Sequence, residues 1–343
     1  MTYYITRRLL QAIPLLIIVT VIIYGLLKAV GDPLAHLAND PLVRAEDRAH
    51  LRRSLGLDDP IPLQFVHWLI GDDWYQRDLD FDGVPDTYGE RRGVLRGDLG
   101  ESFRFNKPVV DVIREVLPNT LILGITAYVV TIVFGVGIGI FAALRQYSFL
   151  DNLITGISFF LFSMPIFLVA LLAVYIFAVK FKEWGLPALP TGGMYDVRGN
   201  RTLDELLIRL ILPVFSLAAI SIARYARFVR ASMLEVINSD YIRTARAKGL
   251  SERRINYVHS LKNASLPVIT LMGLDIPAIL SGAVVTETIF GWPGMGRLFI
   301  DSLTILDPPV LIIFVLMTAL AVVLMQLFTD ILYAWLDPRI HYT

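Results

Sequence analysis

The chain has no cysteine among its 343 residues. This absence excludes a disulfide framework and any metal or iron–sulfur site that needs thiolate ligands, although it leaves the cellular compartment open. Charged residues are also few, at 18%, whereas 55% of the residues are hydrophobic and the mean hydropathy is +0.60. Soluble globular domains carry a larger charged share. The composition therefore favours an integral membrane protein.

Two further absences limit the chemistry. No Lys-Ser or Lys-Thr dipeptide occurs, so the chain cannot supply the end of a phosphate-binding Walker A loop, and we do not expect it to be an enzyme that hydrolyses ATP. The five histidines are scattered, and we assign them no metal or catalytic role. The formal net charge is zero, and we expect no nucleic-acid partner.

Six apolar stretches are long enough to be candidate membrane helices, since a helix needs about 20 residues to cross the hydrocarbon core. They are Leu9–Leu27, Val116–Leu144, Asn152–Val179, Leu206–Ala223, Pro267–Thr286 and Pro308–Thr329. Arg209 interrupts the fourth stretch, and Asp275 interrupts the fifth. The sequence therefore predicts an all-α integral membrane protein with about six transmembrane helices.

The first stretch also fits a secretory signal peptide, because Arg7 and Arg8 precede it. It is too long for the apolar core of a signal peptide, however, and no small-x-small cleavage pattern follows Lys28. We interpret it as an uncleaved first membrane helix. The Gly-x-Gly-x-Gly run at 135–139 lies inside the second stretch with no strand before it, and it predicts close helix packing rather than nucleotide binding.

Basic residues set the predicted orientation, because Lys and Arg gather in short cytoplasmic loops. The segment 224–266 carries nine Lys and Arg against three Asp and Glu, so we place it in the cytoplasm together with both termini. The predicted organisation is then an N-terminal membrane helix (1–30), an extracytoplasmic subdomain (31–115), a five-helix core with a cytoplasmic coupling loop at 224–266 (116–335), and a cytoplasmic tail (336–343). A helix is predicted over Arg44–Leu55, ended by Gly56.

The cytoplasmic segment has its own local signals. Asn238, Ser239 and Asp240 supply helix N-cap chemistry, and a helix over Tyr241–Lys248 would end at Gly249 in the left-handed conformation. Ser251 begins a second helix toward Ala264, before Leu266 and Pro267 return the chain to the membrane. A short cationic helix-turn-helix of this kind could dock into an acidic groove of a partner, or it could be only a positive-inside loop.

Residues Tyr241–Arg254 resemble the coupling-loop signature of dipeptide/oligopeptide-type ABC importer permeases. Further segments resemble that family: Leu55–Pro60, Gly97–Ser102, Thr286–Gly296 and Asp337–Arg339. The general importer motif has Glu-Ala-Ala where this chain has Arg243, Thr244 and Ala245, a departure that resembles the peptide and nickel branch. The resemblance implies a type-1 importer permease fold. It also implies that an ATPase subunit contacts these coupling residues: Arg243, Thr244, Ala245, Ala247, Lys248 and Gly249.

As a member of that family, the chain would be a pore-forming subunit in the cytoplasmic membrane that translocates peptides or a similar small solute. The resemblance implies two ATP-binding subunits, a second related permease and an extracytoplasmic solute-binding protein. The alternative is an ion- or proton-coupled secondary transporter that uses Asp275 and Glu287. Against it, the chain shows no paired inverted repeat. These two carboxylates could line the solute path or bond to neighbouring helices.

An acidic run in the extracytoplasmic region spaces its carboxylates at alternate positions before Gly83, as calcium loops do. The candidate ligands are Asp78, Asp80, Asp82, Val84, Asp86 and Glu90. The twelfth position of the pattern is Gly89, and Glu90 follows one residue late. The run is therefore either a structural calcium site, the only cofactor that we expect, or a solvated acidic turn.

Overall fold

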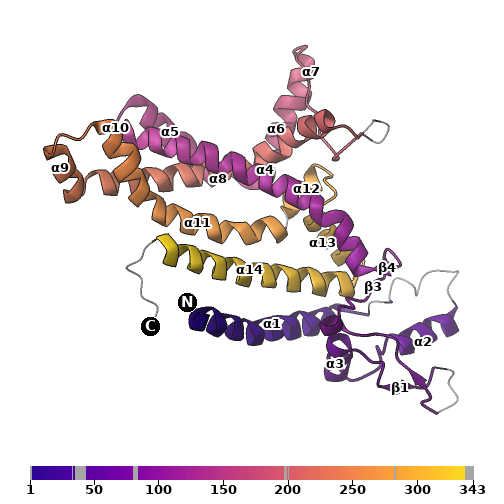
Figure 1. Cartoon of the computed structure of the whole chain (residues 1–343). Helices are drawn as coiled ribbons and strands as arrows, with labels where there is room; N and C mark the ends of the chain where they lie inside the picture. The colour runs from indigo at the N-terminus through magenta and orange to yellow at the C-terminus, as the bar shows by residue number, and fades with distance from the viewer. Residues whose placement is uncertain are drawn as a thin grey trace. The chain divides into compact units, whose positions relative to one another are not determined.

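The computed structural model describes residues 2–32, 34, 44–79, 84–196, 199, 201–281 and 283–336. Helices dominate these ranges (Figure 1), and the strands form two short antiparallel hairpins: β1 (Gln76–Arg77) with β2 (Thr87–Tyr88), and β3 (Glu101–Ser102) with β4 (Lys107–Pro108). The chain divides into two compact units. The core unit holds residues 117–297 and the chain from 321, and the outer unit holds residues 2–116 and 298–320.

Four described helices are long and apolar enough to cross a membrane. They lie at Leu10–Val30 within α1 (Thr2–Val30), at Val109–Leu144 (α4), at Leu203–Ile237 (α8) and at Pro308–Thr329 within α14 (Pro308–Leu336). Three of them coincide with the predicted first, second and sixth spans. The predicted fourth span is longer than expected, because α8 continues as a helix through the first arginines of the cytoplasmic segment.

The predicted third span, Asn152–Val179, is not one straight helix. Helix α5 (Phe149–Ser163) is followed by a second helical stretch from Ile166 to Glu183, made of α6 (Ile166–Val174), the π-helix η3 (Tyr175–Lys180) and α7 (Phe181–Glu183), and the two halves are bent by 105°. Pro165 explains the bend, since a proline disfavours helical backbone at the preceding residue, and Met164 is extended. Counting this pair as one span gives five.

The predicted fifth span, Pro267–Thr286, is also broken. Helix α11 (Leu261–Ser281) ends before α12 (Val284–Ile289), and Ala283 between them has non-helical backbone angles. A further short helix, α13 (Met295–Thr304), follows. The described residues therefore carry four or five spans by length and composition, where the sequence predicted about six.

Helix α8 lies at the centre of the core unit, where it contacts α5, α6 and α11. Its Tyr225 and Val229 are buried in a cluster with residues of α4 and α11. A β-carbon at Gly135 would lie 2.7 Å from that of Tyr225, and one at Gly139 would lie 2.7 Å from that of Val229. The glycines at this spacing let α4 approach α8 closely, which confirms the predicted helix-packing role.

The outer unit builds a small subdomain at the end of α1. It contains α2 (Ala45–Ser54), α3 (Ile61–Ile70), the 3-10 turn η2 (Val94–Arg96) and both hairpins, and we call residues 44–108 the outer subdomain. Helix α2 confirms the predicted helix, and Gly56 after it has φ +60°. Tyr24 and Leu27 of α1 share an apolar cluster with Leu311 and Ile312 of α14. Ser102 donates a hydrogen bond to Asp307 over 2.6 Å.

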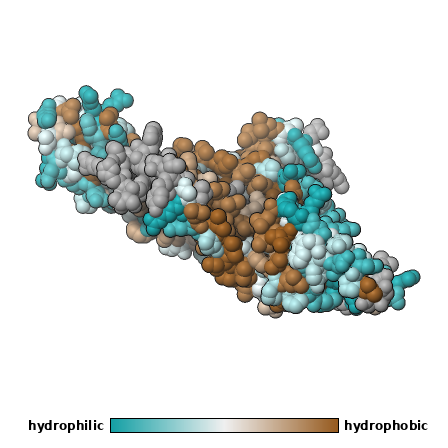
Figure 2. All heavy atoms as spheres, turned by 60° about the horizontal axis from the view of Figure 1, so that its bottom comes forward, coloured by the Kyte–Doolittle hydropathy of each residue, from teal (hydrophilic) through white to brown (hydrophobic). Residues whose placement is uncertain are grey.

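Large apolar side chains remain exposed along the candidate spans. On α1, for example, Leu10, Ile18 and Ile22 are 56–61% exposed. Figure 2 shows broad brown areas of hydrophobic residues on the surface, distinct from teal hydrophilic areas. An apolar surface of this extent is a hazard in water but suits a bilayer or another membrane subunit.

Candidate functional site

The predicted coupling helix is present as α9 (Asp240–Ala247) (Figure 1). Ser239 is its N-cap, as predicted, but the Ser239 side chain accepts no capping bond and instead donates to the carbonyl of Val236 over 2.6 Å. Asp240 lies in the first turn and Arg246 in the last turn. Both charges oppose the helix dipole and stabilise the helix at its ends.

Gly249 ends this helix in the left-handed conformation that the sequence predicts, with φ +80°. Its N–H donates to the carbonyl of Arg246 over 2.9 Å, and the N–H of Leu250 donates to that of Ala245 over 3.3 Å. No atom lies within 4 Å of the place that a β-carbon would occupy. Glycine is therefore favoured here by the backbone angle and not by crowding.

Helix α9 has one buried side and one open side. Ile242 is fully buried, and the helix contacts the following segment, while the Asn263 amide donates to the Tyr241 hydroxyl over 3.0 Å. Of the six predicted coupling residues, Ala245 is half-buried and the others are exposed: Arg243, Thr244, Ala247, Lys248 and Gly249. The structure thus gathers these residues on an open, basic surface, which we call the coupling surface.

The helix after the coupling surface is longer than predicted. A helical rod, which is one uninterrupted helical stretch, runs from α10 (Glu252–Arg254) through the π-helix η4 (Ile255–Ser260) into α11. Leu266 and Pro267, where the chain was predicted to return to the membrane, lie inside it. The rod also carries Asp275. One continuous element therefore joins the coupling surface to the membrane core.

The two predicted carboxylates, Asp275 and Glu287, line the same cavity of about 160 Å³ in the core unit. Its walls come from α4, α8, α11 and α12, and include Thr120, Tyr128 and Arg224. Pockets that hold small ligands usually measure about 300–1,000 Å³. The cavity would have to widen before a peptide could pass.

Asp275 is held by two groups on α8. The Arg224 guanidinium forms an ion pair and a hydrogen bond with its carboxylate, and the Tyr225 hydroxyl donates to the same oxygen over 2.8 Å. The Tyr128 hydroxyl, from α4, donates to the carbonyl of Met272 over 3.0 Å. The carboxylate therefore ties α8 to α11 while it faces the cavity.

Glu287 is fully buried, and each of its two carboxylate oxygens accepts a hydrogen bond. Its carboxylate accepts from the Thr120 hydroxyl and from the backbone N–H of Arg297, each over 3.0 Å, so it stabilises the start of α13. A β-carbon at Gly294 would lie 2.4 Å from its carboxyl carbon. Only a glycine at position 294 therefore leaves room for the Glu287 carboxylate.

Some site residues were missed by the sequence reasoning. Arg224 and Arg230 were counted only as orientation signals, yet Arg230 binds Asp151 through two bonds of 2.6 and 2.8 Å, and the Asp151 side chain is 1% exposed. Arg227, between them, lies over the rings of Phe159 and Phe162. Arg224, Arg227 and Arg230 are spaced three residues apart, which places them along one side of α8. This spacing is the sequence feature that could have identified them as site residues.

The proposed calcium ligands lie partly outside the described residues, since Asp80 and Asp82 are among those left undescribed. Asp78 forms an ion pair with Arg53 over 3.2 Å, and the Asp86 carboxylate accepts from the Thr87 hydroxyl. Within the described ranges, no three acidic, histidine or cysteine residues are placed to hold a metal. Calcium binding here stays a prediction.

Comparisons with known proteins point in one direction. A family model described as "Binding-protein-dependent transport system inner membrane component" matches residues 135–342, and the model of its N-terminal region matches residues 1–124. The oligopeptide transport system permease protein AppB of Bacillus subtilis is 38% identical over 100% of both chains. The dipeptide transport system permease protein DppB of Alkalihalophilus pseudofirmus is 37% identical, again over 100% of both.

One solved structure shares the fold. It is a chain of the MetNI methionine ABC transporter in inward facing conformations, with a TM-score of 0.50 and 13% identity. The match covers 66% of this chain and 97% of the other. At this identity the match supports a type-1 importer permease fold and nothing about the solute.

Proposed function

Since this chain belongs to the family of binding-protein-dependent transport system inner membrane components, we propose that it is the pore-forming permease subunit of an ABC importer for peptides. The family consists of multi-pass membrane components and not of enzymes. Peptides are proposed as the solute because the similar proteins are named as oligopeptide and dipeptide permeases. Both termini are proposed to be cytoplasmic, on the arginine distribution.

The coupling surface is the observation that carries the proposal. Its basic and small side chains are presented on a short helix whose other side is anchored by Ile242. This geometry suits insertion into an acidic groove of a separate ATP-binding subunit. ATP hydrolysis is assigned to two such subunits, because this chain offers no Walker A sequence. A second permease and an extracytoplasmic binding protein complete the proposed assembly.

The helical rod suggests how the movement is transmitted. When ATP closes the partner subunits, they displace α9, and the rod from Glu252 to Ser281 carries that displacement to Asp275. The ion pair between Asp275 and Arg224 joins the rod to α8. Rigid-body rocking of packed helices between two arrangements would open and close the path. The secondary-transport alternative is not favoured, since Asp275 already has a cationic partner.

The test is to purify the assembly in mild detergent and to identify what co-purifies. Recovery of an ATP-binding subunit and a second permease, lost when residues 241–251 are deleted, is the expected result. In the reconstituted complex, Gly249→Val should lose peptide uptake while ATP hydrolysis continues. A chain that purifies alone and drives uptake from an ion gradient would overturn the proposal.

Gly185→Val is a matched control for Gly249→Val. Gly185 follows α7 with φ +71°, has no atom within 4 Å of its β-carbon position, and shows the same bonding pattern, from its own N–H to Lys182 and from the N–H of Leu186 to Phe181. The local strain of the two variants should therefore be similar. Only the variant on the coupling surface should separate ATP hydrolysis from transport.

A further inference from the structure

A second cavity lies in the outer unit and has a volume of about 690 Å³. Its walls come from the last turn of α1, the end of α2, the end of α3, the segment 87–106 and the start of α14. The volume falls within the range of about 300–1,000 Å³ that small-ligand pockets occupy. The cavity has room for a short peptide but not for a folded partner.

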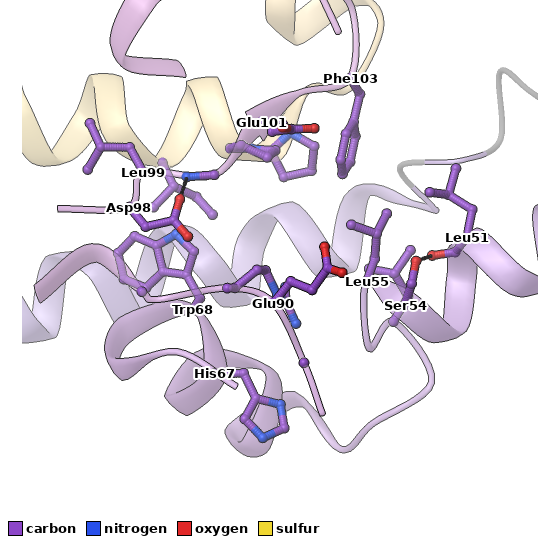
Figure 3. Close-up of a pocket in the computed structure, with 18 of the residues that line it drawn as sticks. Leu51, Ser54, Leu55, His67, Trp68, Glu90, Asp98, Leu99, Glu101 and Phe103 are labelled. Carbon is purple, nitrogen blue, oxygen red and sulfur yellow. Dashed lines mark hydrogen bonds between the residues drawn. The ribbon is translucent and has the colours of Figure 1, made fainter. Parts of the chain in front are cut away.

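The cavity wall is largely apolar and aromatic. Leu51 faces it from α2, Leu55 from the C-cap of that helix, Trp68 from α3, and Phe103 from the turn after β3 (Figure 3). Tyr24 of α1 also lines it. Rings and branched aliphatic side chains of this kind would bury apolar side chains of a ligand without requiring one particular sequence.

Three charged side chains on this wall differ from most charged residues of the outer unit. Most of its acidic side chains are engaged, as Asp72 is with Arg77 and Arg91. Glu90 and Glu101, in contrast, form no ion pair with any described residue, and they reach into the same space from opposite walls (Figure 3). Lys28, at the end of α1, lines the cavity and likewise lacks an ion-pair partner among the described residues.

Charges of both signs that form no ion pair with a described residue, although the Lys28 ammonium lies 5.8 Å from the centre of the Tyr24 ring, stand beside this apolar wall and match a particular kind of ligand. A short peptide with free termini carries an ammonium group at one end, a carboxylate at the other and variable side chains between them. We propose that the outer cavity is a binding site for short peptides, in which Glu90 and Glu101 receive the ammonium group and Lys28 receives the carboxylate. The inference rests on the proposed function, and it adds a site on the permease itself, apart from any binding protein.

The first experiment is a titration of the whole purified chain, in detergent and without partners, with a tripeptide whose termini are free. Binding should weaken about tenfold or more when the N-terminus is acetylated, because a charge-assisted hydrogen bond is lost. The double variant Glu90→Gln, Glu101→Gln should bind the free and acetylated forms equally well. The variant Lys28→Met should in the same way lose the preference for a free carboxylate over an amide.

Glu46→Gln is the matched control, since Glu46 is an exposed carboxylate on α2 that does not line the cavity. Its titration should match that of the unmodified chain. The comparison of free with blocked tripeptides uses the unmodified chain, so its result does not depend on whether a variant folds. No binding to the unmodified chain, or equal binding of free and doubly blocked tripeptide, would overturn the inference.

A separate assay distinguishes this inference from the proposed function. Peptide uptake is measured in vesicles that contain the complete complex. If vesicles take up peptide but the purified chain binds none at the outer cavity, the inference of an outer peptide site is wrong and the proposed permease function still holds. Absence of ATP-dependent peptide uptake would count against the permease function itself.

Discussion

The outer subdomain and the coupling surface are both rich in charge and both contain left-handed glycine, but they use these residues in opposite ways. In the outer subdomain the Asp72 side chain is 1% exposed between Arg77 and Arg91, and a β-carbon at Gly56 would lie 2.3 Å from the Arg77 guanidinium. On the coupling surface the charges are exposed and Gly249 stands in open space. The first arrangement stabilises one fold, and the second leaves a surface available to another chain.

The electrostatics of the outer subdomain follow from this burial. Burial raises the pKa of Asp72, but Arg91 and Arg77 outweigh it and hold the pKa below its ordinary value. Burial and the nearby Arg77 together lower the pKa of His67. The folded subdomain therefore contains a charged Asp72 and a neutral His67, each matched to its surroundings.

Asp72→Asn should have the largest effect, because it leaves two arginines without their buried counter-ion. Breaking a buried pair costs about 3–5 kcal/mol, and here the cost should appear as faster hydrogen exchange of the amides in α3 and β1. Asp73→Asn is the control, since its pair with Arg96 is about half exposed, and exchange should hardly change. Similar exchange rates in the two variants would contradict a structural role for the buried network.

Gly294→Ala should rank second. Its β-carbon would meet the carboxyl group of Glu287, and forced overpacking of this kind costs about 1–3 kcal/mol. Gly137→Ala is the control, because this helical glycine has nothing within 4 Å of its β-carbon position and alanine is the better helix former. Thermal unfolding in detergent should separate the two variants. If Gly294→Ala melted at the same temperature as the unmodified chain, the Glu287 side chain would be able to adopt another conformation, and the crowding argument would be wrong.

Short-range features of both regions could be predicted from sequence. The capping residues around Asn238–Asp240 and the glycines at 56 and 249 set the limits of α2 and α9, because helix ends depend on neighbouring residues. Pro165 is the local signal for the bend, whereas the prediction of one third span rests on the absence of charge and on length alone. An uncharged, mostly apolar run of 28 residues satisfies the length rule whether or not it is straight.

Long-range pairs could not be predicted in the same way. Arg224 and Asp275 are 51 positions apart, Arg230 and Asp151 are 79 apart, and Glu287 is 167 positions from Thr120. Each pair depends on which helices pack together, and a single sequence gives no measure of that. The sequence identified Asp275 and Glu287 as unusual, but only the fold supplies their partners and the cavity that they share.

His67→Gln tests the outer network by pH and should have a smaller effect. Because the folded state lowers the pKa of His67, the unfolded chain binds more protons as pH falls below about 6.5. Stability should then decrease with falling pH, by at most about 1.4 kcal/mol per pH unit. Unfolding measured between pH 7 and 5 should become less pH-dependent in His67→Gln than in the unmodified chain, and an unchanged slope would contradict a neutral, buried His67.

The smallest effect on stability is expected on the coupling surface itself. Arg243→Gln with Lys248→Gln should change the free energy of unfolding by no more than about 0.5 kcal/mol, because surface side chains away from buried partners contribute little. Capture of the ATP-binding subunit should nevertheless weaken, and added salt should reduce the difference from the unmodified chain, because salt screens exposed charges. Lys182→Gln, an exposed cation on α7, should leave capture unchanged. A clear loss in the free energy of unfolding of the double variant would mean that these charges stabilise the fold, as those of the outer subdomain do. The distinction between the two regions would then be wrong.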